Sequence, residues 1–157
     1  MKSQEHHVNS FIKAAADVLK LQADMEIYPE TESCSTDDAN QEVNLIIGLT
    51  GRLNGSVSIG MSEKTAKEIA SAMVKSDLDD KKMIGSLITA LGTAISSEAS
   101  LSLCEMGFEC TSLFPTLVTG TGVNLSSPIR EQHSVSLNSR VGPIELRTSL
   151  FERRGMA

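Results

Sequence analysis

A long stretch without proline between positions 79 and 106, DDKKMIGSLITALGTAISSEASLSLCEM, constrains the fold more than any other feature. Apolar side chains recur in it every three or four residues, which is the spacing of one helical face. They are Ile84, Leu87, Ile88, Leu91, Ala94, Ile95 and Ala99. Ser76 and Asp77 are suitable N-cap residues, and Gly107 is a typical residue after a helix end. The sequence therefore predicts one helix, about 40 Å long, packed on a core.

The opposite side of this predicted helix carries small and polar side chains. They are Ser86, Ala90, Thr93, Ser97, Ser100 and Cys104. Such side chains bury little apolar area, so we expect this side to meet solvent or a partner protein. We call the set Ser86, Ala90, Thr93 and Ser97 the outer stripe.

Composition limits the class of protein. The chain has 157 residues, which is suited to a single domain over 1–157. A net charge of −6 and 3% aromatic residues argue against nucleic-acid binding, which needs a basic surface. Three cysteines, without a CxxC or Cys/His cluster, indicate neither a disulfide framework nor a metal site, and no cofactor is expected. The sequence shows no signal peptide and no apolar stretch approaching 18 residues, so we expect a cytoplasmic protein without a membrane span.

The remaining patterns predict an α/β domain in which long helices pack against a mostly antiparallel sheet. Predicted helices cover 8–22, capped by Asn9 or Ser10, and 63–75, capped by Ser62. Predicted strands cover 25–28, 43–50, 56–61, 108–113, 116–119, 134–139 and 144–151. Gly51, Asn54 and Gly55 supply the turn of a hairpin. An acidic loop covers 30–40, and the tail 152–157 has no pattern.

Other candidate sites have simpler explanations. The glycine-rich Gly48–Ser56 lacks the lysine of a phosphate-binding loop and precedes a strand, so its glycines are expected in turns. His6 and His7 are neighbours that point in different directions, and a solvated N-terminus is the simpler interpretation. Glu98 falls on the apolar side by helical phase, and we expect it to be solvated where the helix projects past the core. Cys104 is interpreted as a small filler.

Three segments together resemble the CheC/CheX/FliY family of chemotaxis phosphatases, and CheX in particular. They are 48–74 (GLTGRLNGSVSIGMSEKTAKEIASAMV), 86–107 (SLITALGTAISSEASLSLCEMG) and 114–120 (FPTLVTG). The resemblance extends from about residue 8 to residue 151. It implies a fold of two long helices against a sheet and a homodimer associated through the sheets. It also implies a partner, the CheY-like response regulator that the family dephosphorylates.

The family signature on the long helix is Glu-x-x-Asn, and the resemblance implies a role for each residue. The Asn amide orients a water for in-line attack on the aspartyl phosphate, and the Glu pairs with a lysine of the regulator. Residues three apart share one helical face, so the pair acts by positioning. In this chain Ala90 and Thr93 occupy the two positions, and no Glu is followed three residues later by Asn.

These observations predict a non-catalytic, CheX-like domain of chemotaxis or two-component signalling. It would bind a CheY-like receiver domain through the outer stripe. The alternative is an aspartyl-phosphate phosphatase that uses substitute residues, with Thr93 and Glu98 as candidates. A third interpretation is a subunit of a larger complex without receiver contact.

Overall fold

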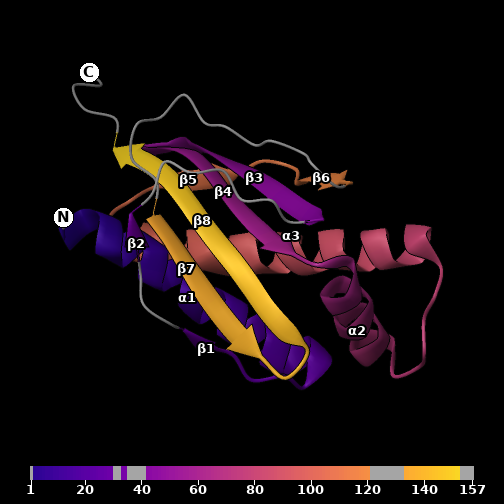
Figure 1. Ribbon diagram of the computed structural model, residues 1–157. Helices are drawn as coiled ribbons and strands as arrows, with labels where there is room; N and C mark the ends of the chain where they lie inside the picture. Colours follow the sequence, from indigo (N-terminus) through magenta and orange to yellow (C-terminus); the bar gives the residue numbers. More distant parts are fainter. Residues whose placement is uncertain (1, 30–32, 35–41, 121–132, 153–157) are drawn as a thin grey trace.

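The computed structural model describes residues 2–29, 33–34, 42–120 and 133–152, and these form three helices and an eight-stranded sheet. In chain order the elements are α1 (Lys2–Ala23), β1 (Tyr28–Pro29), β2 (Ser33–Cys34), β3 (Val43–Gly51), β4 (Leu53–Met61), α2 (Glu63–Val74), α3 (Lys81–Glu105), β5 (Cys110–Ser112), β6 (Thr116–Thr119), β7 (His133–Ser139) and β8 (Gly142–Glu152). Figure 1 shows the chain leaving the sheet after β4, passing through α2 and α3, and then returning to the sheet. This order of helices and strands is the predicted one.

Two hairpins form the middle of the sheet. β3 and β4 pair along their lengths, from Val43 opposite Met61 to Leu49 opposite Gly55. β7 and β8 form the second hairpin, and β4 lies beside β8. The resulting order is β1-β7-β8-β4-β3-β5, with β2 also on β7 and β6 also on β3. Every pairing among the described strands is antiparallel, which confirms the predicted sheet type.

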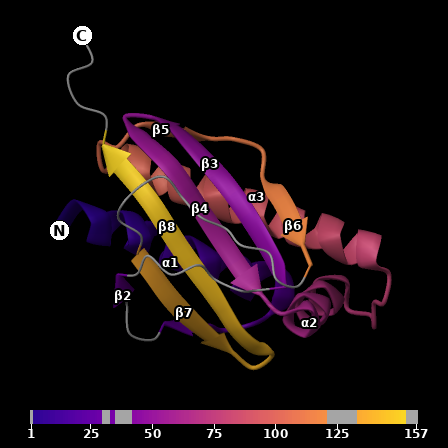
Figure 2. The same cartoon turned by 45° about the horizontal axis from the view of Figure 1, so that its top comes forward.

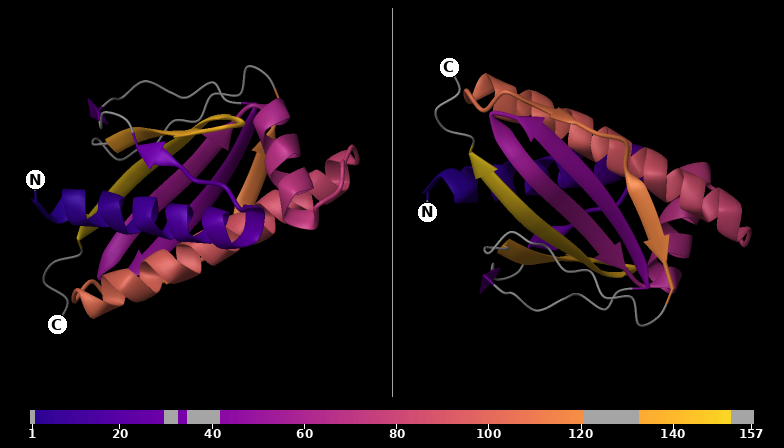
Figure 3. Two further views of the ribbon diagram at one scale, coloured as in Figure 1. Left: turned by 90° about the horizontal axis from the view of Figure 1, so that it is seen from below. Right: turned by 90° about the horizontal axis from the view of Figure 1, so that it is seen from above.

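The two long helices, α1 and α3, cover one face of the sheet (Figure 3). Alternate strand residues are buried beneath them, as expected for a sheet with one covered face. The buried set includes Leu45, Ile47 and Leu49 of β3, Val57 and Ile59 of β4, Val135 and Leu137 of β7, and Ile144 and Leu146 of β8. The shorter α2 lies at the end of the sheet and contacts both long helices (Figure 2). The predicted α/β class, with two long helices on an antiparallel sheet, is confirmed.

Helix α3 begins later than predicted. Its N-cap is Asp80, whose side chain accepts a hydrogen bond from the amide of Lys82 at 2.9 Å. The predicted caps, Ser76 and Asp77, are wrong because that stretch still completes the end of α2. The amide of Ser76 donates to the carbonyl oxygen of Ser71 at 3.1 Å. The predicted end is confirmed: Gly107 has φ +92 and follows the last turn of the helix.

Helix α1 begins earlier than the predicted range 8–22. Asn9 and Ser10 lie inside the helix, so neither is its N-cap. The additional turn brings His7 onto the inner face, where it is 2% exposed and meets Phe108 edge-on with ring centroids 4.8 Å apart. The expectation that His7 belongs to a solvated N-terminus is therefore wrong. His7 lies just before the predicted helix 8–22, so the helical periodicity did not place it in the core.

Two local expectations need correction, and a third lies outside the described residues. The predicted strand 25–28 contributes only Tyr28 to β1, although Met25 and Ile27 are buried without strand pairing. Within the predicted acidic loop 30–40, residues 33–34 form β2, which pairs with β7. The other residues of this range lie outside the described residues. The tail beyond residue 152 also lies outside the described part of the chain.

The predicted hairpin turn is shorter than expected. Gly51 already ends β3, and Asn54 and Gly55 already belong to β4, so only Arg52 lies between the two strands. Gly55 has φ +131, and a Cβ there would lie 2.0 Å from the carbonyl oxygen of Ser149. Glycine at this position therefore permits β8 to approach β4 closely.

Helix α3 is, among the described residues, the one helix whose length and composition would allow it to cross a membrane. This differs from the expectation that no stretch of the sequence is apolar over such a length. Its inner residues Ile88, Leu91, Ile95 and Leu103 are buried in the core with the sheet. Packing in the core accounts for these four residues.

Candidate functional site

The outer stripe lies on the face of α3 that points away from the core. Ser86, Ala90, Thr93 and Ser97 are all exposed. Their exposure confirms the helical phase predicted from the sequence. Ser100 is an exception, because it is 9% exposed and its hydroxyl lies toward the thiol of Cys110 on β5.

Two large apolar side chains extend the outer stripe at its ends, and the sequence analysis did not identify them. Met83 and Leu101 are 49% and 64% exposed. At about 100° of rotation per residue, both project in the same direction as Ala90 and Ser97. The signal was present in the sequence, because their spacing to Ser86 and Ser97 is three and four residues.

The hydroxyl of Thr93 is bound to its own helix. Its Oγ1 donates a hydrogen bond to the carbonyl oxygen of Thr89 at 2.9 Å. Thr89 repeats the arrangement one turn earlier by donating to Gly85 at 2.8 Å. Ala90, the other position of the family signature, carries only a methyl group. At these two positions, only the Thr93 oxygen can take part in a hydrogen bond with a partner, and only as an acceptor. The one hydroxyl proton of Thr93 is already donated to Thr89.

Glu98 faces the neighbouring helix α1. Its side chain is exposed, as expected, and its carboxyl group lies beside Asp17 and Lys13. Partial desolvation between the helices and the like charge of Asp17 raise the pKa of Glu98, and Lys13 opposes that shift. Glu98 is about 140° around the helix from Thr93, so the two side chains do not form a pair on one face.

Two cysteines lie close together at the C-terminal end of α3. The Sγ of Cys104 is 3.8 Å from the carbonyl oxygen of Cys110, and both are free thiols. Cys104 is exposed, which does not fit the expectation of a buried filler. Burial, together with the neighbouring Cys104, raises the pKa of the Cys110 thiol. Thiolate chemistry at neutral pH is therefore weaker at Cys110 than at an ordinary cysteine.

The other candidate residues do not converge on a site. The glycine-rich segment Gly48–Ser56 belongs to strands β3 and β4 and their turn, as expected. The side chain of His6 lies outside the described residues. Within the described ranges, no three His, Cys, Asp or Glu side chains gather where a metal ion could bind.

Solved structures with the same fold include two CheX proteins. The CheX of Desulfovibrio desulfuricans matches with a TM-score of 0.85 and 21% identity, over 94% of this chain and 99% of that one. The chemotaxis protein CheX of Vibrio vulnificus matches with a TM-score of 0.84 and 23% identity, over 92% and 99%. A third match is the CheX–CheY–BeF3–Mg²⁺ complex of Borrelia burgdorferi, with a TM-score of 0.77 and 24% identity, over 93% and 98%.

Sequence comparison agrees with this fold. No curated protein sequence matches the chain. The family model of the chemotaxis phosphatase CheX matches residues 43–138, which is more than half of the chain and includes α3 with its outer stripe. By this match, the chain belongs to the CheX family.

Proposed function

We propose that the chain is a CheX-like signalling domain that binds a CheY-like receiver domain through the outer stripe and does not hydrolyse its aspartyl phosphate. The partner class is supported by the Borrelia burgdorferi structure, in which a CheX protein of the same fold is in complex with CheY. The binding surface is supported by the exposure of the outer stripe along α3.

The shape of the stripe suits a protein partner. Small side chains such as Ala90 and Ser97 let another surface approach the helix closely. Met83 and Leu101 stand at either end, and each is about half exposed. Covering them would contribute about 1 kcal/mol each, taken as half of the value for burying a whole side chain. The stripe therefore combines a flat centre with two apolar anchors.

The absence of hydrolysis is supported chiefly by the hydrogen bond from Thr93 to the carbonyl oxygen of Thr89, together with the alanine at position 90. In-line attack on a phosphoryl group needs a water held in position, and enzymes of this kind gain most of their rate from such positioning. Ala90 offers no polar atom. Thr93 can accept a hydrogen bond from a water, but it has no free proton to donate while it bonds to its own helix, whereas an Asn amide offers both an acceptor and donors. Neither side chain can hold a water in the way that the family's Asn amide does.

A binding measurement tests the docking surface. Isothermal titration calorimetry with CheY-like receiver domains of the same cell, free and phosphorylated, should give measurable affinity. Ala90→Arg places a long cation on an exposed position, so it should weaken binding at least tenfold and leave the free energy of unfolding within about 0.5 kcal/mol. Gln22→Arg, exposed on α1, is the matched control and should bind normally. No binding to any receiver would exclude the proposal.

The second candidate function is a phosphatase with substitute residues. It is favoured by the family description, which is that of a phosphatase, and by the exposure of Thr93. It requires a phosphate-release rate that depends on Thr93. The orientation of Glu98 toward Asp17 argues against a cooperating pair. A phosphate-release assay with a phosphorylated receiver separates the two candidates.

We further propose that the chain forms a homodimer through its sheet edge and works in the cytoplasm. Leu113 and Phe114, between β5 and β6, are 53% and 95% exposed. Exposed large apolar residues that neighbour each other often mark protein interfaces. Sedimentation equilibrium should give a dimer mass for the wild type and a monomer mass for Phe114→Asp. Leu21→Asp, 85% exposed at the end of α1, is the control and should remain a dimer.

A further inference from the structure

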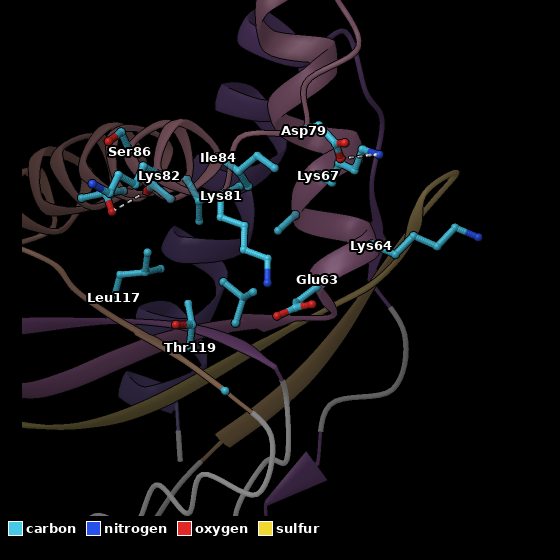
Figure 4. A pocket seen from close by; sticks show the side chains of 16 residues that line it. Glu63, Lys64, Lys67, Asp79, Lys81, Lys82, Ile84, Ser86, Leu117 and Thr119 are labelled. Carbon is cyan, nitrogen blue, oxygen red and sulfur yellow. Dashed lines mark hydrogen bonds and ion pairs between the residues drawn. The ribbon is translucent and has the colours of Figure 1, made fainter.

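A groove lies beside the first turns of α3 and is distinct from the outer stripe. It is bordered by α2, α3 and β6, and its volume is about 1180 Å³. Figure 4 shows Lys81 extending into it, with Glu63 and Thr119 on the far side. The groove and the outer stripe share only Ser86. A ligand in the groove can therefore be tested separately from a partner on the stripe.

The lining of the groove is basic, although the chain as a whole is acidic. It includes four lysines, Lys64, Lys67, Lys81 and Lys82, against the carboxylates of Glu63 and Asp79. These six side chains sum to about +2, or about +1 without Lys64, which points outward in Figure 4, whereas the whole chain carries −6. A local field of this sign attracts anionic groups and repels cationic ones.

The lysines are not equally available. Lys67 is 3.1 Å from the carboxylate of Asp79, and this partner raises the pKa of Lys67. Lys64 points away from the groove in Figure 4. Lys81 projects into the groove, and no carboxylate among the described residues lies within ion-pair distance of it. Lys81 is therefore the cation best placed to meet a ligand.

Apolar side chains also line the groove. Ile84 of α3 and Leu117 of β6 are partly exposed and line the groove, together with the buried Val43 of β3. Small-molecule sites commonly have volumes of about 300–1,000 Å³ and are more enclosed than this open groove. Its size and its combination of apolar and cationic lining residues fit a short stretch of polypeptide better than a small organic anion.

We propose that this groove binds an acidic, amphipathic segment of a partner protein. A carboxylate of the segment pairs with Lys81, and its apolar side chains cover Ile84 and Leu117. This mode of recognition, with apolar anchors in a groove and charges at the rim, is common for peptide segments. The inference goes beyond receiver docking and does not depend on it.

The test uses a random 12-residue peptide library displayed on phage and selected against the immobilised full-length chain. Enriched peptides should carry net negative charge and at least two aliphatic side chains. Synthetic fluorescein-labelled versions are then titrated with the chain, and fluorescence anisotropy gives their affinity. Lys81→Glu should weaken binding at least tenfold, because it removes a charge-assisted contact and adds a repulsive one. Binding should also weaken as salt concentration rises.

Lys64→Glu is the matched control. It makes the same change in net charge close to the groove, but its side chain points outward, so the loss in affinity should be less than threefold. Enrichment of no acidic peptide would overturn the proposal. So would acidic peptides that bind Lys81→Glu as tightly as the wild type. A fall in the sedimentation mass of Lys81→Glu, with no peptide enriched, would identify the groove as a contact between copies of the chain and would also overturn it.

Discussion

Gly92 determines how closely α3 approaches the sheet, and Gly92→Ala tests this role. A Cβ at Gly92 would lie 1.8 Å from Cδ2 and 3.1 Å from Cγ of Leu45 on β3. Ordinary carbon–carbon contacts are about 3.5–4.0 Å, so the groups would have to separate by roughly 1.7 Å. Leu45 is 1% exposed and has little room to move aside. The new methyl group must therefore displace the helix or distort the core.

Two opposing effects give the magnitude. Alanine is favoured over glycine inside a helix by about 1 kcal/mol. Overpacking a filled core costs about 1–3 kcal/mol, and a clash this short belongs near the upper end. The net loss of unfolding free energy for Gly92→Ala should be about 1–2 kcal/mol. For a chain of this length, that corresponds to a fall in Tm of about 2–8 °C.

Gly85→Ala is the matched control on the same helix. Its Cβ would lie 3.0 Å from Cδ2 of Leu117, which is a partly exposed side chain that can shift. Here the helix preference should prevail, and the variant should gain up to about 1 kcal/mol. Urea unfolding followed by circular dichroism, at one protein concentration for all variants, measures both. Equal stability of the two variants would refute the account of how α3 is seated.

Three further predictions concern single groups. Iodoacetamide should label Cys104 before Cys110, as followed by mass spectrometry, because Cys104 is exposed and the pKa of Cys110 is raised; faster labelling of Cys110 would contradict this. Ser62→Ala should cost about 1 kcal/mol in urea unfolding, because the Ser62 side chain caps α2; an unchanged midpoint would exclude the cap. Asp17→Asn should lower the pKa of Glu98 in an NMR titration. Because the pKa of Glu98 is raised in the folded state, the free energy of unfolding should decrease as pH rises through the titration of Glu98. Asp17→Asn should make this decrease smaller. An unchanged Glu98 titration in Asp17→Asn would count against the contact between Asp17 and Glu98.

Helical periodicity was sufficient to predict which face of α3 is exposed. The apolar residues of α3 lie on one side of the helix, and this side has to pack against the sheet. Ala90 and Thr93 lie on the opposite side and therefore point outward. The hairpin of β3 and β4 and the Ser62 cap of α2 were also predicted from local signals. These features depend on contacts between residues that are close in sequence.

Features that depend on distant contacts were not predicted. The burial of His7 requires Phe108, which is 101 positions further along the chain. The role of Gly92 requires the position of Leu45. The basic groove gathers Lys81 of α3 with residues of α2 and β6, and spacing along the sequence does not show this grouping. Each depends on how the elements pack together.

The central claim is that Ala90 and Thr93 leave a receiver-binding surface without the means to position a water. The most direct measurement is the rate of phosphate release from a phosphorylated CheY-like receiver domain with the chain in excess. The account predicts that the wild type leaves the spontaneous rate unchanged and that Ala90→Glu combined with Thr93→Asn accelerates it. Acceleration by the wild type that disappears in Thr93→Ala would contradict the account.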